Sequence, residues 1–200
     1  MFKKPILLKL INYLPSEIAL GSDLGRDLLT KLRCVLSEHP QESIFQISLS
    51  GVKAIDATCF RESIVALGLI EKSKKGLFIT DIENEDIIFN LECATSSKGL
   101  PLLIVSDLGM DWVGKKMTIS QKEIIQKIYS KSQITTSTLA KELNISTQNA
   151  SIKLKKLMDD GYLLGEKINS ISGGHEYIYT PFYTKKEVED NKQKPHSKWG

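Results

Sequence analysis

The sequence predicts an α/β unit, with helices on a mostly parallel or mixed sheet, followed by an α+β unit of three helices and a hairpin. Strand-like and helix-like patterns alternate up to about residue 106, whereas three helical patterns and then two strand patterns follow residue 118. The composition, with 41% hydrophobic and 26% charged residues, is typical of a folded globular chain.

Seven elements are predicted in the first unit, residues 1–106. Runs rich in Val, Ile and Leu predict its strands, and apolar side chains at helical spacing predict its helices, with Asp23 and Thr58 as N-caps. The expected order is strand 6–13, helix 24–37, strand 44–49, helix 58–71, strand 77–82, helix 83–94 and strand 100–105. This alternation favours helices packed on a sheet whose strands run mostly parallel.

Residues 107–117 separate the two patterns. They contain two Gly and show no clear period, so we predict a linker here, followed by a second unit over 118–183. Beyond it, residues 184–200 are highly charged and poor in apolar side chains, which predicts a disordered tail.

Three helices open the second unit. Ser120, three residues before Glu123, predicts a capping box at the start of the first helix. Asn144 is expected to end the second helix in the left-handed conformation, and Ser146 to cap a third helix over 147–159. The short connection between the second and third helices is typical of a helix-turn-helix.

A Gly-Gly-tipped hairpin follows, and the whole region resembles the winged helix-turn-helix domains of bacterial transcriptional regulators, including the MarR-type group. Two stretches carry the resemblance: Leu139-Ala-Lys-Glu-Leu-Asn-Ile-Ser and Leu154-Lys-Lys-Leu-Met-Asp-Asp-Gly-Tyr-Leu. The resemblance implies that the third helix enters the major groove of double-stranded DNA. It also implies that the hairpin reaches an adjacent phosphate backbone or minor groove.

The third helix carries the candidate DNA-binding side chains. Gln148 and Asn149 suit bidentate contacts with adenine, and Lys side chains suit phosphates. The candidates are Thr147, Gln148, Asn149, Ser151, Ile152, Lys153, Lys155 and Lys156 on the helix, and Lys167, Asn169 and His175 near the hairpin. Two features depart from the resembled class: Ile152 stands at a commonly basic position, and the region contains no Arg. The alternative interpretation is that these Lys side chains are simply solvated.

Charge is distributed unevenly along the chain. Residues 115–200 hold 15 Lys, no Arg and 9 acidic residues, a net charge of +6, whereas the whole chain carries +3. An acidic first part joined to a basic second part is typical of a control module attached to a polyanion binder.

The first unit contains a stretch that resembles the central strand and switch loop of STAS domains, the fold of bacterial anti-sigma-factor antagonists. The stretch is Ile47-Ser-Leu-Ser-Gly-Val-Lys-Ala-Ile-Asp-Ala-Thr-Cys-Phe, and Leu20-Gly-Ser-Asp-Leu-Gly-Arg-Asp-Leu-Leu resembles the opening of STAS-like variants. The resemblance covers about residues 5–106. It implies a phospho-switch in which a kinase modifies Thr58, beside Asp56, and thereby breaks binding to a protein partner.

A simpler interpretation of the same loop is that Thr58 caps a helix and Asp56 forms a turn. The chain also departs from classical STAS domains, because Cys59-Phe60 replaces their small Gly-Leu pair. Both interpretations of Asp56 and Thr58 stay open from the sequence.

Other classes of function find little support in the sequence. Three Cys without C-x-x-C spacing and three scattered His predict no disulfide framework, metal site or cofactor. No phosphate-binding Gly loop, nucleophile elbow or zinc-protease motif is present, so we expect no enzyme activity. The apolar run near residue 5 is short and precedes no cleavage site, which predicts a cytoplasmic protein without a membrane anchor.

The sequence therefore predicts a DNA-binding transcriptional regulator whose STAS-like unit senses a signal or contacts a protein. A homodimer is expected, because two-fold operators need two recognition helices. The alternative is a signalling adaptor whose winged helix binds a protein and no DNA.

Overall fold

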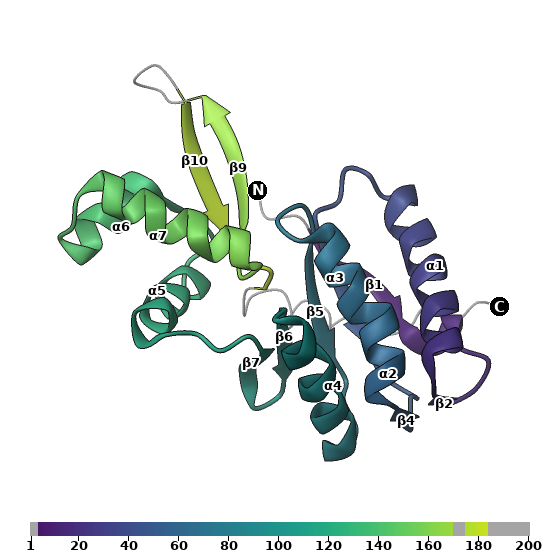
Figure 1. Ribbon diagram of the computed structural model, residues 1–200. Coiled ribbons are helices and arrows are strands. Elements are labelled where there is room, and N and C mark those ends of the chain that lie inside the picture. Colours follow the sequence, from purple (N-terminus) through teal and green to yellow (C-terminus); the bar gives the residue numbers. More distant parts are fainter. Residues whose placement is uncertain (1–3, 170–174, 184–200) are drawn as a thin grey trace.

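A five-stranded sheet forms the centre of the computed structural model, which describes residues 4–169 and 175–183 (Figure 1). The strand order is β1-β3-β5-β6-β7. The strands are β1 (Ile6–Lys9), β3 (Ile44–Ser48), β5 (Gly76–Thr80), β6 (Pro101–Ser106) and β7 (Gly109–Gly114). The first four run parallel, and β7 runs antiparallel to β6. The protein is thus mixed α/β with a mostly parallel sheet, as the sequence predicted.

One face of the sheet is covered by helices (Figure 1). They are α1 (Ser22–Glu38), a helical segment made of α2 (Ala57–Phe60), a π-turn (Arg61–Val65) and α3 (Ala66–Glu71), and α4 (Glu85–Lys98). Leu77 and Ile79 of β5 point into the cluster under these helices, whereas Phe78 between them belongs to a second cluster. The central strands β3, β5 and β6 are buried on both faces, which explains their largely apolar sequence.

Several predicted elements differ from the observed ones. The first strand ends at Lys9 and continues as a 3₁₀ turn, Leu10–Tyr13. Two short strands that the sequence did not predict, β2 (Ile18–Ala19) and β4 (Ala54–Ile55), pair in parallel. Two residues are too few to produce an alternating pattern.

The largest difference from the sequence-based prediction lies in the predicted linker, residues 107–117. Within 107–117, the residues Gly109–Gly114 form the edge strand β7, because Leu102, Leu103 and Ile104 of β6 pair with Val113, Trp112 and Asp111. The composition of this segment hid the strand, because Val113 and Trp112 pack on opposite faces while Met110 and Asp111 are exposed, so no alternating pattern results. The division of the chain into separate domains stays a prediction.

The remaining residues form three helices and a small antiparallel sheet. The helices are α5 (Ile119–Tyr129), α6 (Thr136–Leu143) and α7 (Thr147–Asp160). The sheet has the order β8-β10-β9, with β8 (Ile134–Thr135), β9 (Leu164–Asn169) and β10 (His175–Thr180). The predicted tail, 184–200, and the predicted hairpin tip, 170–174, lie outside the described residues.

The capping box of α5 lies two residues earlier than predicted. Thr118 Oγ1 accepts the Gln121 amide at 3.3 Å, and Gln121 Oε1 accepts the Thr118 amide at 2.9 Å. Thr118 is extended, with φ −69° and ψ 162°, so the helix begins at Ile119 and the predicted cap, Ser120, lies inside its first turn.

The second cluster joins these helices to the other face of the large sheet. Phe78 and Leu103 of the sheet lie in one cluster with Ile124, Leu154 and Phe182. The Phe182 ring covers Gly76, where a Cβ would come within 2.4 Å of Phe182 Cδ1. The sheet is therefore the middle layer of the molecule, with α1–α4 on one side and the C-terminal segments against the other.

Buried polar bonds and aromatic contacts hold this second cluster together. The Tyr129 hydroxyl donates to the Tyr162 carbonyl at 3.1 Å and accepts the Phe182 amide at 3.3 Å. The Tyr162 hydroxyl in turn donates to the Lys115 carbonyl at 2.6 Å. Trp112 of β7 contacts Tyr129 and Tyr162 edge-on, with ring centroids 5.9 and 4.9 Å away. Burial raises the pKa of both tyrosines, that of Tyr162 to about 12, so both hydroxyls stay protonated donors.

Candidate nucleic-acid interface

A three-residue connection sets α7 against α6. Asn144 ends α6 in the left-handed conformation, with φ 50°, as predicted. The Ile145 amide donates to the Ala140 carbonyl at 3.0 Å, and Ser146 Oγ accepts the Asn149 amide at 3.2 Å. Every residue of the connection thus bonds a helix end, which keeps the angle between the two helices constant.

The helix α7 has one buried and one exposed face. Ala150, Leu154 and Leu157 are buried against α5 and α6. The opposite face exposes Thr147, Gln148, Asn149, Ser151, Ile152, Lys155 and Lys156. Ile152 is 59% exposed, which is unusual for a side chain that could pack inward. The structure thus brings the predicted α7 residues except Lys153 together on one surface, which we call the α7 face.

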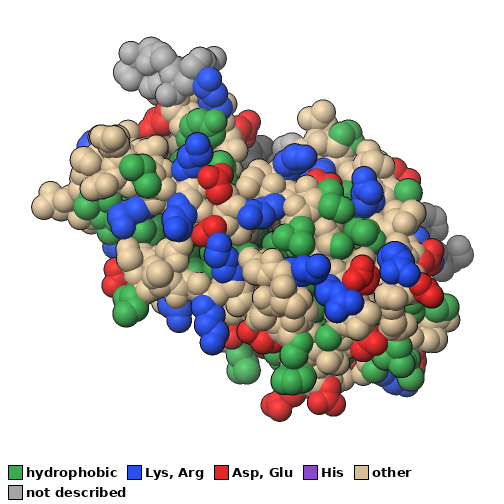
Figure 2. Space-filling model, viewed as in Figure 1, with side chains coloured by type: hydrophobic (Ala, Val, Ile, Leu, Met, Phe, Trp, Pro, Cys, Tyr) green, Lys and Arg blue, Asp and Glu red, His purple; other side chains and the backbone are tan. Residues whose placement is uncertain are grey.

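Positive charge dominates the α7 face. No acidic residue occurs from Ser146 to Met158, and Lys155 and Lys156 have no ion pair within the described part of the chain. Lys153 is half-buried, and its Nζ lies 3.4 Å from Ser120 Oγ of α5. Asp160, at the far end of α7, pairs with Lys115 at 2.7 Å. In Figure 2 basic side chains lie over the region of α7 with a few acidic ones nearby, and further basic side chains are spread over the rest of this face.

The hairpin contributes one described candidate side chain. Lys167 of β9 is exposed and lies opposite Tyr177 of β10. Asn169 and His175 face each other in the ladder, but their side chains lie outside what the structure describes. The sequence reasoning missed Tyr177, which is 43% exposed and stacks on Tyr179 at 6.0 Å. Its alternation with Tyr179 could have indicated a shared face.

The second candidate site, the predicted phospho-switch, lies at the start of α2. Asp56 Oδ1 accepts the Cys59 amide at 2.6 Å, and Asp56 Oδ2 accepts the Gly21 amide at 3.0 Å. Asp56 is therefore the N-cap, and the prediction that Thr58 caps this helix is wrong. Asp56 is extended, with ψ 163°, so the helix begins one residue later and Thr58 falls inside its first turn. Thr58 is partly exposed.

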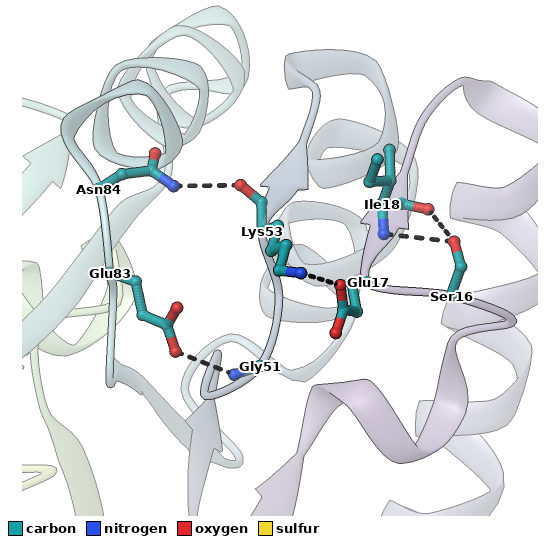
Figure 3. Close-up of polar contacts among 7 residues, drawn as sticks. All are labelled: Ser16, Glu17, Ile18, Gly51, Lys53, Glu83 and Asn84. Atoms are coloured by element: carbon teal, nitrogen blue, oxygen red, sulfur yellow. Dashed lines mark hydrogen bonds and ion pairs between the residues drawn. The ribbon is translucent and has the colours of Figure 1, made fainter.

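The segment before Asp56 is held by residues far away in the sequence (Figure 3). The Gly51 amide donates to Glu83 Oε1 at 3.1 Å, and Asn84 Nδ2 donates to the Lys53 carbonyl at 3.1 Å. Lys53 Nζ pairs with Glu17 Oε2 at 2.5 Å, and this contact raises the pKa of Lys53. The loop that presents Asp56 and Thr58 is thus anchored on both sides.

The two candidate sites lie apart. Cys59 and Phe60, next to the predicted switch, belong to the cluster under α1–α4, whereas Ala150 and Leu154 of α7 belong to the other cluster. The structure does not bring Thr58 and the α7 face together (Figure 1). Whether Thr58 is phosphorylated stays a prediction.

The capping role of Asp56 can be tested by mutation. Asp56→Ala is expected to lower the free energy of unfolding by about 2 kcal/mol, because two amides lose their acceptor. Thr58→Ala is expected to change it by less than about 0.5 kcal/mol. Urea unfolding followed by circular dichroism measures both. A larger loss in Thr58→Ala than in Asp56→Ala would contradict the assignment.

The described residues near this loop show neither an activated cysteine nor a group of metal ligands. Burial, followed by the nearby Asp56 carboxylate, raises the pKa of the Cys59 thiol to about 11, which disfavours the thiolate. Within residues 4–169 and 175–183, no three His, Cys, Asp or Glu side chains are grouped to hold a metal ion. In the same part of the chain, no helix is both long and apolar enough to cross a bilayer.

Comparisons with known proteins add little. No protein-family model matches the chain, and no curated protein matches it. One similar solved structure is described as a "possible transcriptional regulator from Methanosarcina mazei Go1". It shares 24% identity, the match covers 37% of this chain and 62% of that one, and the TM-score is 0.30. The chain thus matches less than two thirds of that protein, and a TM-score this low carries no functional conclusion.

Proposed function

We propose that this protein is a DNA-binding transcriptional regulator. In this proposal α5, α6, α7 and the β9–β10 hairpin form a winged helix-turn-helix, and the preceding unit is a STAS-like module that receives a signal or contacts a protein. The protein carries out no catalytic step of its own.

The α7 face is the observation that carries the proposal. It combines exposed Gln148 and Asn149 near the helix N-terminus with Lys155 and Lys156 farther along, and it contains no acid. Amide side chains can read adenine in the major groove, and the lysines can neutralise phosphates on either side. The exposed Ile152 gives an apolar group that can contact a thymine methyl.

The hairpin supports the same geometry. It projects from the C-terminal end of α7 (Figure 1), and its Lys167 is an exposed cation. The bond from Ser137 Oγ of α6 to Glu176 Oε1 of β10, at 2.9 Å, ties the hairpin to the helices. A tethered hairpin can contact the backbone flanking the groove that α7 occupies. A two-fold DNA site would then be bound by a homodimer.

The test is selection of double-stranded oligonucleotides by the full chain over a salt series. We expect enrichment of one sequence class. Gln148→Ala/Asn149→Ala should abolish the enrichment and leave the salt slope unchanged, because these side chains contact bases and not phosphates. Lys155→Gln/Lys156→Gln should weaken binding to every sequence and reduce the slope of log K against log salt by about 2.

A charge-matched control separates the α7 face from the net charge. Lys74→Gln/Lys98→Gln removes two exposed cations from the first unit, and it should leave both the enrichment and the slope unchanged. Absence of enrichment at every salt concentration would overturn the proposal. It would favour the adaptor, whose winged helix binds a protein.

A further inference from the structure

A cavity outside the α7 face lies between the edge strand β7 and helix α5. Its volume is about 550 Å³, within the range of roughly 300–1,000 Å³ that small-molecule sites occupy. Its apolar lining comes from Met110, Trp112, Met117, Ile125 and Tyr129. The Trp112 indole is half-buried, and the two Met side chains are flexible, so an aromatic or other flat apolar group can be accommodated.

Most of the charged groups at this cavity already have partners. Lys115 pairs with Asp160 at 2.7 Å. Glu92 Oε2 accepts the Gly114 amide at 2.8 Å, and Asp111 Oδ1 accepts the Trp112 amide at 2.8 Å. Backbone N–H groups thus stabilise both carboxylates of the lining.

Two lysine side chains at the same cavity can still form an ion pair with a ligand. Lys116 and Lys122 are exposed, and neither has an ion pair or a hydrogen-bond partner among the described residues. Lys116 lies two residues before Thr118, the N-cap of α5, and Lys122 lies in the first turn of this helix. The cavity therefore combines an apolar lining with two lysines that have no partner among the described residues, beside the exposed Asp111 carboxylate.

We propose that this cavity binds a small organic anion with a planar apolar body, such as an aromatic carboxylate. The ring lies against Trp112 and Met117, and the carboxylate is paired with Lys116 and Lys122. Such a ligand bridges β7 of the large sheet to α5, which packs beneath α7. If the proposed function is correct, the ligand thereby sets the position of the α7 face and changes the affinity for DNA.

Calorimetric titration of the full chain tests the site directly. The probes are biphenyl-4-carboxylate and its neutral analogue, biphenyl-4-carboxamide. We expect the carboxylate to bind at least tenfold more tightly, because only the anion pairs with the lysines. Lys122→Gln should remove this preference, whereas Lys127→Gln, an equal charge change on α5 away from the cavity, should leave it intact.

Further outcomes decide against the site. Gln126→Trp places a large side chain at the lining and should lower the affinity for both probes more than tenfold. Undiminished binding would overturn the site. Equal affinities for the two probes would overturn the anion assignment, and no heat with either probe at millimolar concentration would overturn the cavity. Binding that appears only after removal of residues 184–200 would also overturn the proposal, by identifying the chain's own C-terminal segment as the occupant.

The effect on DNA is measured separately, by repeating the oligonucleotide binding with saturating biphenyl-4-carboxylate. A fivefold or larger change in affinity that Lys122→Gln abolishes supports the coupling, and an unchanged affinity overturns the coupling while leaving the calorimetric result intact. If the chain binds no DNA, the titration still stands, so the two proposals fail in distinguishable ways.

Discussion

Gly114→Ala is expected to destabilise the protein by about 3–5 kcal/mol. Gly114 has φ +84°, and a Cβ at this position would lie 2.2 Å from the Leu100 carbonyl oxygen and 2.6 Å from Thr95 Cβ. The first contact is with backbone, so no side-chain rotation relieves it, and left-handed strain adds to it. At this length, the loss corresponds to a decrease in Tm of roughly 10 °C.

Gly99→Ala is the matched control for this substitution. Gly99 also has positive φ, at +62°, but its added Cβ meets nothing within 4 Å. Gly99→Ala is therefore expected to lower the free energy of unfolding by only about 1 kcal/mol, which is the conformational penalty alone. Thermal unfolding of both variants measures the difference. Equal losses would contradict the steric argument and the close packing of β7 against Leu100.

Phe182→Ala is expected to cost about 3–5 kcal/mol, the usual range for removing a buried phenyl ring. Phe182 is 5% exposed, its ring covers Gly76 of the large sheet, and it lies 6.2 Å from the Trp112 ring. Because its cluster includes residues of both the sheet and the C-terminal helices, the loss should lower the stability of both parts together.

Urea unfolding followed by near-ultraviolet and far-ultraviolet circular dichroism tests that shared stability. We expect the midpoints from both signals to decrease together in Phe182→Ala. Phe89→Ala is the control, because Phe89 is 68% exposed on α4 and its removal should cost less than about 0.5 kcal/mol. A wild-type midpoint in the near-ultraviolet signal of Phe182→Ala would contradict a shared core.

The central sheet gives the protein a direct physical connection between its two candidate sites. Leu77 and Ile79 pack under α1–α4, where Asp56 caps α2, and Phe78 between them packs toward the C-terminal helices. A displacement of a strand on one side therefore changes packing on the other. Under the proposed function, a signal received by the first unit would reach the α7 face through this sheet.

Local residue patterns were enough to predict most elements. The helix ends at Asn144 and Ser146 were predicted correctly, because left-handed and N-cap positions depend on one residue and its immediate neighbours. The exposed face of α7 was also predictable, since apolar residues at Ala150, Leu154 and Leu157 leave the opposite side to solvent.

Tertiary contacts selected the observed structure at some places where the local residue pattern allowed more than one interpretation. Asp56 and Thr58 are both good N-caps, and Asp56 accepts the Gly21 amide, 35 residues away, as well as the local Cys59 amide. At α5, by contrast, the local capping box between Thr118 and Gln121 selects Thr118 over Ser120. The edge strand β7 had no clear period of its own, and its pairing with β6 made it a strand.

The sequence by itself determined the mostly parallel α/β architecture, the three C-terminal helices and the polar, acid-free side of α7. These features depend on the periodicity of neighbouring side chains, which the chain carries before it folds. The tertiary structure alone decided that the C-terminal segments pack on the open face of the sheet, and that β7 and α5 line a cavity. Both depend on surfaces brought together from distant parts of the chain, and a pattern along the sequence contains no record of such contacts.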